Sequence, residues 1–459
     1  MCQAYCFLFC LFILLNQTLS QSSDKQLIKK IDQLVSKDYS SLAPGCAVLI
    51  AKKDQVLYEK AFGIANLELN VALKTDMVFR IGSITKQYTA VGILKLMEEG
   101  KLSLKDSLQR FFPEFPFKGH TITIENLLTH TSGLIDYQVF DIGINNAIRL
   151  DLPYSLLLDS LAPRPLLFSP GSKFEYSNSN YFLLGMIIEK LTGKKYDSYL
   201  QEAILKPAGL LNTYYDSPVR IIPGRVNGYT KLDSEYKNTD YISMSQVFSA
   251  GALLANVNDL FKWNKALRSY SIIRKETLDK AWGNFRLSDS AYAGYGYAWF
   301  NSEFQGLKTI WHGGAIDGFR SIECYFPNQE YFLAVLINSE NSEGFFTFID
   351  NLSRMFAGAS GPNKDITIAE AVLEPYIGKY RFTEDTTQSI SIKKKGKYLY
   401  ADLSNKTGMS MVLVPQSSTL FYLPDVRRIR TTIEFLMENG IVKELTWTQE
   451  KKHRAIRSN

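Results

Sequence analysis

A serine and a lysine three residues apart are the side chains of this sequence best suited to chemistry. Ser83 and Lys86 open a predicted helix whose middle carries little polar surface and which stops at Gly100. Residues three apart lie on one face of a helix, so the lysine amine can reach the serine hydroxyl. Burial favours the neutral amine, which is a base, and the start of a helix stabilises negative charge on the serine. The pair therefore predicts an activated nucleophile.

The spacing by itself is a weak signal, because Ser-x-x-Lys occurs four times, starting at Ser22, Ser83, Ser234 and Ser391. Of these, Ser83 alone opens an apolar helical pattern. The alternative interpretation is a serine near a helix N-terminus, with a lysine whose amine extends to solvent. Residues farther along the chain favour the catalytic interpretation.

The segment after a Pro-Gly turn at 170–171 supplies two more polar candidates, Tyr176 and Asn178. Residues two apart in an extended chain point the same way, so both side chains can face one cavity. A phenol can transfer protons when nearby cations lower its pKa, and an asparagine amide can hold a substrate carbonyl. The alternative is a packed tyrosine beside a helix-capping asparagine.

A histidine and two glycines end a predicted strand. They are His312, Gly313 and Gly314, and the glycines would let another backbone approach closely. The next N–H group belongs to Ala315. It is a candidate for half of an oxyanion hole whose other half is the Ser83 N–H.

The remaining histidines give no metal site. His130 follows a short predicted helix at 124–129, and we favour a structural histidine bonding backbone carbonyls over a ligand or a base. The four scattered histidines of the chain give no ligand pair at helical spacing. We therefore expect no metal and no cofactor.

The elements that would position these residues follow from the apolar periodicity. Helices are expected at 26–35 and in an irregular excursion at 135–170 that would wall a substrate cleft. Strands are expected at 45–50, 56–62, 318–326 and 331–337. The pattern indicates an α+β domain over 27–355, with an antiparallel sheet flanked by helices.

Residues beyond a small-residue linker at 356–366 show a different pattern. Seven strand candidates fall between residues 376 and 450, with a hairpin signal at Asn439-Gly440. This predicts a second domain over 367–459, a small, closed, lipocalin-like antiparallel β-barrel.

An apolar block at residues 1–20 is typical of a signal peptide, with cleavage expected before Gln21. Its apolar core is too short to span a bilayer comfortably. An uncleaved anchor is the alternative, because the block lacks Lys and Arg. We expect an exported protein, periplasmic or secreted, without a stable membrane span after cleavage. Cys46 and Cys324 would then remain, as one disulfide or as two buried thiols.

The net charge and a missing motif argue against two classes of protein. The 459 residues carry a net charge of only +6 without a concentrated basic stretch, which argues against a nucleic-acid partner. A Ser-His-Asp hydrolase is excluded because no Gly-x-Ser-x-Gly motif occurs.

Five stretches, taken in order, carry a resemblance to a known family: 81–86, 99–104, 127–134, 170–178 and 312–314. They resemble the serine β-lactamase and penicillin-binding-protein-like hydrolases, the branch with class C β-lactamases, D,D-peptidases, D-aminopeptidases and related esterases. The resemblance implies a β-lactamase/transpeptidase-like fold over roughly residues 27–355. It also implies that Ser83 is acylated and that Lys86 and Tyr176 transfer protons. Which of the two is the general base stays open.

The same resemblance implies that Asn178 binds a substrate amide and that His312 lies on the strand facing Ser83. β-Lactamases of this group carry lysine at the position of His312, whereas some peptidase and esterase members carry histidine. An efficient β-lactamase is therefore not expected. A histidine titrating near pH ~6.5 would add a positive charge on acidification and favour anionic substrates. The alternative is a structural histidine that only bonds a neighbouring carbonyl.

Together these residues predict a serine hydrolase that acts through an acyl-enzyme on a small or peptide-like ester or amide. The competing hypothesis is a non-catalytic ligand sensor or scaffold with the same fold. The complete set of Ser83, Lys86 and Tyr176 favours the enzyme. The choice among ester, lactone, D-amino-acid amide and β-lactam stays open, as does the oligomeric state.

Overall fold

The computed structural model describes residues 25–340 and 351–458 apart from short internal gaps, the longest at 356–367, 404–409 and 424–430. The expected signal peptide at 1–20 and the whole expected linker at 356–366 lie outside the described residues. The chain divides into two compact units, one mainly of residues up to 341 and the other mainly of residues from 342 onward.

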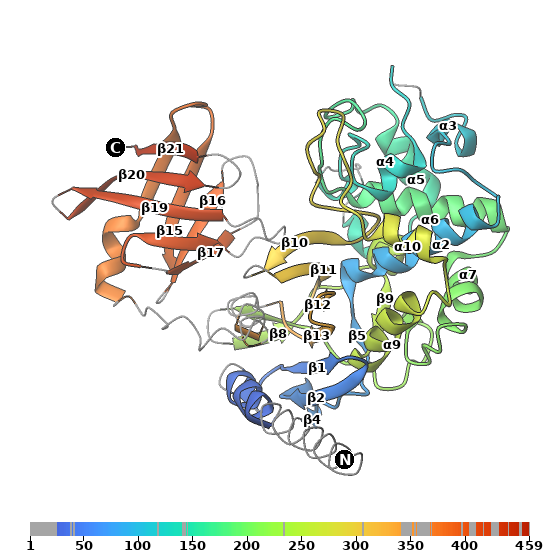
Figure 1. The fold of residues 1–459 in the computed structure, drawn as a ribbon, viewed down its shortest axis with the longest axis horizontal. Coiled ribbons are helices and arrows are strands. Elements are labelled where there is room, and N and C mark those ends of the chain that lie inside the picture. The colour runs from blue at the N-terminus through green and yellow to red at the C-terminus, as the bar shows by residue number, and fades with distance from the viewer. Residues whose placement is uncertain are drawn as a thin grey trace, which may run out of the picture. The chain divides into compact units, whose positions relative to one another are not determined.

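A six-stranded sheet is the centre of the first unit (Figure 1). Its neighbouring strands are, in order, β10 (Phe300–Phe304), β11 (Leu307–Ile316), β12 (Phe319–Phe326), β13 (Tyr331–Ile337), β1 (Cys46–Lys52) and β2 (Gln55–Phe62). β13 is buried along its whole length, as a strand covered on both faces must be. Strand β13 coincides with the predicted range 331–337, and the expected α+β architecture is confirmed.

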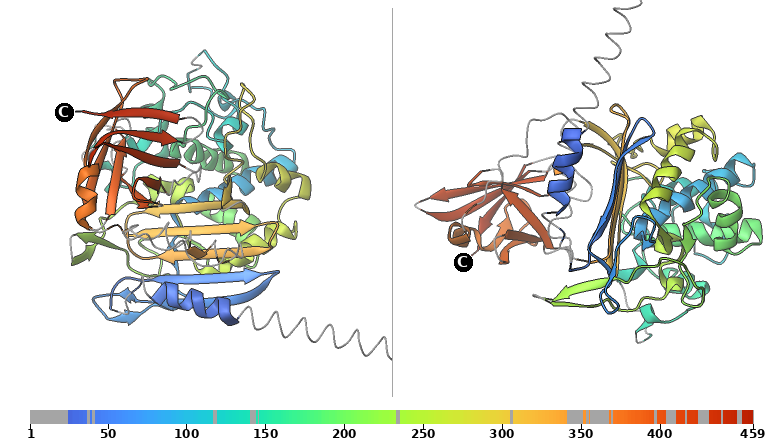
Figure 2. Two further views of the ribbon diagram at one scale, coloured as in Figure 1. Left: turned by 60° about the vertical axis from the view of Figure 1, so that its left-hand side comes forward. Right: turned by 90° about the horizontal axis from the view of Figure 1, so that it is seen from below.

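Helices cover both faces of this sheet (Figure 2, right). A helix over residues 25–36 lies on one face, where Ile31 and Val35 are fully buried. The other face carries the larger helical region, in which α9 contacts β13 and β1. Its helices are α2 (Thr85–Glu98), α3 (Leu108–Phe111), α4 (Ile124–Leu128), α5 (Tyr154–Leu161), α6 (Asn178–Thr192), α7 (Tyr196–Leu200), α8 (Met244–Gly251), α9 (Val257–Arg268) and α10 (Lys275–Ala281).

Helix α2 starts two residues after Ser83 and is buried over most of its length. Gly92 in its middle allows close packing, because a Cβ there would lie 3.1 Å from the Ile188 side chain of α6. The neighbouring segment 135–170 contains α5 and the short helices η2 (Tyr137–Val139) and η3 (Ala147–Arg149), in line with the expected irregular excursion.

Short strands connect the sheet to the helical region. β5 (Phe79–Arg80), β9 (Leu253–Ala255) and β6 (Tyr214–Tyr215) form a three-stranded sheet. Two hairpins, β3 (Ile64–Asn66) with β4 (Val71–Ala72) and β7 (Tyr229–Leu232) with β8 (Glu235–Asn238), complete the unit.

The second unit is a closed antiparallel barrel, and the expected barrel is therefore confirmed. Sequence reasoning found seven of its strands and missed the eighth, β21, which carries four charged or histidine side chains in six residues. The strands are β14 (Gly378–Phe382), β15 (Ser389–Lys395), β16 (Tyr398–Leu403), β17 (Ser410–Pro415), β18 (Leu420–Leu423), β19 (Thr431–Glu438), β20 (Ile441–Thr448) and β21 (Lys452–Arg457), preceded by η5 (Glu370–Tyr376). Closure comes from β14, which pairs with β21 and places Tyr380 opposite Arg457.

Two open points of the sequence analysis are answered by the described residues. Cys46 and Cys324 are buried thiols on β1 and β12, not a disulfide. Within the described part of the chain, no helix is both long and apolar enough to cross a membrane.

Candidate active site

The backbone ahead of Ser83 is held from two sides. β5 ends at Arg80, and the Ile81 N–H donates to the Leu253 carbonyl of β9 at 3.0 Å. Gly82 then adopts φ +48°, which favours glycine, and a 3₁₀ turn, η1 (Gly82–Ile84), leads into α2. Ser83 is partly exposed in this turn, whereas its two neighbours are buried. A substrate can therefore reach its hydroxyl.

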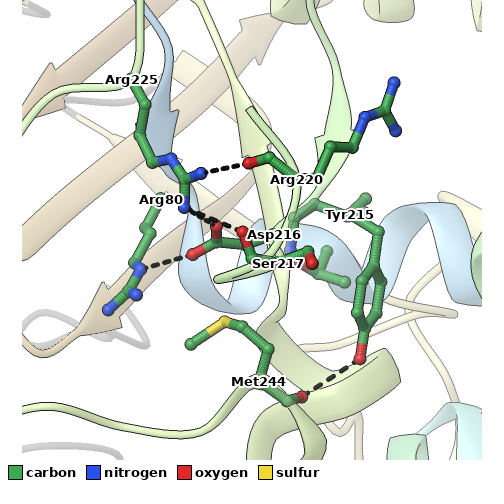
Figure 3. A network of polar contacts seen from close by, with 9 residues as sticks. Arg80, Tyr215, Asp216, Ser217, Arg220, Arg225 and Met244 are labelled. Atoms are coloured by element: carbon green, nitrogen blue, oxygen red, sulfur yellow. Dashed lines mark hydrogen bonds and ion pairs between the residues drawn. The ribbon is translucent and has the colours of Figure 1, made fainter. Parts of the chain in front are cut away.

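An ion-pair network fixes the strand that leads into this turn (Figure 3). The fully buried carboxylate of Asp216 binds the Arg80 Nε and the Arg225 Nη1, each at 2.8 Å. Arg225 also donates to the carbonyls of Ser217 and Arg220. The buried carboxylate has two cationic partners, and Arg225 has further acceptors. The network therefore offsets the free-energy cost of burying the Asp216 charge.

Lys86 lies on the first turn of α2 and is completely buried. Its amine donates to the Ser83 hydroxyl at 3.0 Å, the Asn178 side-chain oxygen at 2.8 Å and the Ala250 carbonyl at 2.8 Å. The amine also lies 4.8 Å from the centre of the Tyr176 ring. The structure thus brings the serine, the lysine and two more of the expected site residues together.

Burial also changes the chemistry of this amine. Loss of solvation lowers the pKa of Lys86 from 10.5 to about 7, against the opposing effect of the Asp136 carboxylate. At neutral pH a large fraction of the amine is therefore unprotonated and can accept the Ser83 proton.

Tyr176 has the opposite shift. Burial raises the pKa of its phenol, and the nearby Ser83 hydroxyl counters only part of that rise. Among the described residues its buried hydroxyl has no hydrogen-bond partner, which leaves it available to a ligand atom. The phenol stays protonated at neutral pH, so it suits a proton donor better than a base.

His130 supports the Tyr176 ring, whose centre lies 4.2 Å from that of the imidazole. His130 does follow helix α4, but its Nδ1 accepts from the Ser177 N–H at 3.2 Å and contacts the Asn180 amide at 3.1 Å. The expectation that it bonds backbone carbonyls is wrong, because the start of α6 presents donors to it. Burial lowers its pKa well below 6.5, so the ring is neutral.

Asn178 is the first residue of α6 rather than part of an extended segment. Its side-chain oxygen accepts from Lys86, and its side-chain nitrogen donates to Asp136 at 2.9 Å and Gln138 at 3.0 Å. The groups expected to bind a substrate amide are thus engaged with protein partners. Sequence reasoning missed Asp136, because nothing in its neighbourhood marks it as part of the site until α6 is placed.

The end of β11 approaches the nucleophile closely. A Cβ at Gly314 would lie 2.0 Å from the Ile81 carbonyl, so only glycine fits there. The Ser321 hydroxyl of β12 donates to the same carbonyl at 2.8 Å. A Cβ at Gly82 would meet the Ala315 nitrogen at 3.0 Å, which places that backbone beside the serine turn, as an oxyanion hole requires. Gly313 has no such crowding, with 3.5 Å to the nearest atom.

His312 is buried on β11 and uses both ring nitrogens within the protein. Nδ1 lies 2.6 Å from the Gly313 carbonyl and must donate to it, so Nε2 accepts from the Tyr295 hydroxyl at 3.0 Å. Burial and the nearby Lys86 lower its pKa to about 3. The expectation that His312 titrates near pH ~6.5 and attracts anions is therefore wrong.

A metal ion has no evident place. Within the described ranges, no group of three or more His, Cys, Asp or Glu side chains is arranged to hold one.

Comparison with known proteins agrees with this geometry. The family described as Beta-lactamase matches residues 26–352, and a domain of unknown function matches residues 362–457. The chain is 27% identical over 439 residues to Penicillin-binding protein 4* of Bacillus subtilis, covering 90% of this chain and 94% of that protein. The octameric penicillin-binding protein homologue from Pyrococcus abyssi has a similar structure, with a TM-score of 0.65, 27% identity and coverage of 94% and 99%.

A more distant structure shares the fold alone. The D-amino acid amidase from Ochrobactrum anthropi SV3 is 22% identical, with a TM-score of 0.63 and coverage of 73% of this chain and 100% of that one. A serine paired with a buried lysine on this fold defines the class of acyl-enzyme serine hydrolases. The chain belongs to the β-lactamase family.

Proposed function

We propose that Ser83 is the nucleophile of this hydrolase and that Lys86 is the base that activates it. The observation that carries the proposal is the 3.0 Å contact from the wholly buried Lys86 amine to the Ser83 hydroxyl. A pKa of about 7 gives this amine the balance of neutral form and proton affinity that general bases need near neutral pH.

In the acylation step, the Ser83 oxygen forms a bond to the substrate carbonyl carbon while its proton passes to the Lys86 nitrogen. The N–H groups of Ser83 and Ala315 would stabilise the oxyanion that results. Collapse of the intermediate breaks the bond to the leaving alcohol or amine. The leaving group takes a proton from the Tyr176 phenol, which Lys86 restores. Water then hydrolyses the acyl-enzyme by the same route in reverse order.

We further propose a neutral ester or amide as substrate rather than a carboxylate-bearing β-lactam. His312 occupies the strand position at which β-lactamases of this group have a cation, and its ring is neutral and internally bonded. This strand therefore lacks a positive charge at His312 that could bind an anionic group of the substrate. The fold shared with a D-amino acid amidase supports an amide or ester of this kind.

Export is a separate proposal. The apolar block at 1–20 supports removal of a signal peptide and a location in the periplasm or outside the cell. N-terminal sequencing of the mature protein tests it, and a mature chain that still starts at Met1 would contradict it.

A fluorophosphonate probe with intact-mass and peptide mapping tests the enzymatic proposal. One adduct on Ser83 is expected in the native chain and none in Ser83→Ala, whose kcat for an ester should fall by about four to six orders of magnitude. Labelling of another serine that persists in Ser83→Ala would overturn the proposal. Absence of labelling and turnover in the native chain would favour the ligand-sensor hypothesis.

A further inference from the structure

Asp136, which lies in the segment between α4 and α6, contacts Asn178 twice. One carboxylate oxygen accepts both from the Asn178 backbone N–H and from its side-chain nitrogen, each at 2.9 Å. The other oxygen accepts from the Gln138 backbone N–H at 3.0 Å. The carboxylate is thus held by its own loop and bound to the first residue of α6.

These contacts determine which way the Asn178 amide faces. Its nitrogen can only donate and has two acceptors, the Asp136 carboxylate and the Gln138 side-chain oxygen. Its oxygen must therefore point the other way, where the Lys86 amine donates to it at 2.8 Å. A flipped amide would place a donor against that amine and leave the carboxylate opposite a carbonyl.

We propose that Asp136 is a positioning residue, which orients the Asn178 amide and through it holds the Lys86 amine against Ser83. The inference rests on the proposed role of Lys86 as the base. Asp136 touches neither Ser83 nor the reacting atoms, so it acts only through Asn178 and through its charge.

The effect of the Asp136 charge on the pKa of Lys86 can be measured. Asp136 opposes the effect of burial on Lys86, so its removal should lower the pKa of the amine further. The other titratable groups that face this amine are Tyr176 and Tyr181 from the α6 side, His130 after α4 and His312 on β11. The two phenols have raised pKa values and the two imidazoles lowered ones, so all four stay neutral between pH ~5 and ~9. After the larger effect of burial, Asp136 is then the charged group, among the described residues named here, that adjusts the protonation of Lys86 in this range.

The test is the second-order rate of Ser83 labelling by a fluorophosphonate, measured from pH ~5 to ~9. In Asp136→Asn the midpoint of the rate should move roughly 0.5–1.5 pH units lower, because less alkali is needed to neutralise Lys86. The maximal rate should stay within about threefold, since an asparagine oxygen can still accept from Asn178. In Asp136→Ser the same acid shift should appear, with a maximal rate about 10- to 100-fold lower because the amide is no longer held.

Two controls separate this role from a general one. Asp136→Glu keeps the charge and should keep the native midpoint, whatever its maximal rate. Asp151→Asn removes a carboxylate from the same 135–170 segment that binds Ser243 instead, and should leave the midpoint unchanged. If Asp136→Asn does not fold by circular dichroism, Asp136→Ser gives the midpoint.

An unchanged midpoint in the folded charge-removing variant would overturn the role of Asp136, as would an equal shift in Asp151→Asn. Either result, with normal labelling of Ser83 in the native chain, leaves the proposed function intact. Failure of the native chain to label at Ser83 would instead remove the proposed function itself.

Discussion

Ser83 lies between helix α2, here called the helical flank, and strand β11, here called the strand flank. Each flank buries a basic side chain. The helical flank contains Lys86 with its three hydrogen-bond acceptors, and the strand flank contains His312 with a partner on each ring nitrogen. Burial acts in the same direction on both and lowers both pKa values, to about 7 for the lysine and about 3 for the histidine.

The outcome differs because the two side chains start from different pKa values. A lysine begins at 10.5, so a large loss of solvation brings it to neutral pH and makes it a base. A histidine begins at 6.5, so a similar loss keeps it uncharged at any physiological pH. The helical flank is therefore suited to proton transfer, whereas the strand flank contributes packing and hydrogen bonds of an uncharged ring.

Among changes on the two sides of Ser83, replacement of the helical base should have the largest effect. In Lys86→Met the apolar chain fills the space but accepts no proton, so kcat/KM for an ester should fall roughly 10²- to 10⁴-fold. Steady-state assays at pH ~8 measure this, with fluorescence confirming the fold. A loss below about tenfold would mean that another group is the base, and would remove the contrast between the flanks.

The pH dependence of the native enzyme should show one limb from the helical flank and none from the strand flank. With Lys86 at a pKa of about 7, kcat/KM for a neutral ester should level off above that pH. Below it the rate should fall about tenfold per pH unit, because only the neutral amine accepts the serine proton. A midpoint near pH ~10 would show that the lysine is solvated and charged.

The free energy of unfolding should also depend on pH because of the lowered pKa of Lys86. The folded pKa of Lys86, about 7, lies below the 10.5 of an exposed lysine, so the unfolded chain binds more protons between these values. Stability must then rise with pH across that window, by at most about 1.4 kcal/mol per pH unit. The unfolding free energy of the native chain should therefore rise relative to that of Lys86→Met between pH ~7 and pH ~9. Denaturant titrations at the two pH values measure this change. A difference independent of pH would contradict the burial of a neutral amine.

Changes on the strand flank should be smaller. His312→Gln keeps an acceptor for the Tyr295 hydroxyl, so kcat/KM should change by less than about tenfold. The ratio of kcat/KM for an anionic and a neutral ester should be the same in the native enzyme and the variant from pH ~5.5 to ~8. A ratio that rises on acidification in the native enzyme alone would show that His312 does become charged.

The smallest effect is expected from the C-terminal barrel, for which we propose no part in the chemistry of either flank. A chain truncated after Ala357 should label at Ser83 within about threefold of the native rate, provided that it stays soluble. Labelling by a fluorophosphonate measures this, and a soluble but unreactive truncated chain would give the barrel a role in the site.

Local patterns predicted what local geometry controls. The proximity of Ser83 and Lys86 follows from helical spacing, and β13 from an unbroken apolar run. Asp136 and the protein-bound state of Asn178 could not be predicted, because their contacts join the loop after α4 to the start of α6. Strand β21 could not be predicted because its charged side chains leave no clear apolar alternation. Its place in the barrel is defined by its pairing with β14 and β20.

The closing pair of the barrel has a consequence for engineering. Tyr380, in the middle of β14, lies opposite Arg457 at the end of β21, so the first and last strands of the barrel are neighbours. A module whose two ends meet can be inserted into a surface loop of a host protein with little stretching of that loop. It can also be reopened at another turn once its natural ends are joined. The domain of unknown function is thus a candidate cassette for transfer between proteins.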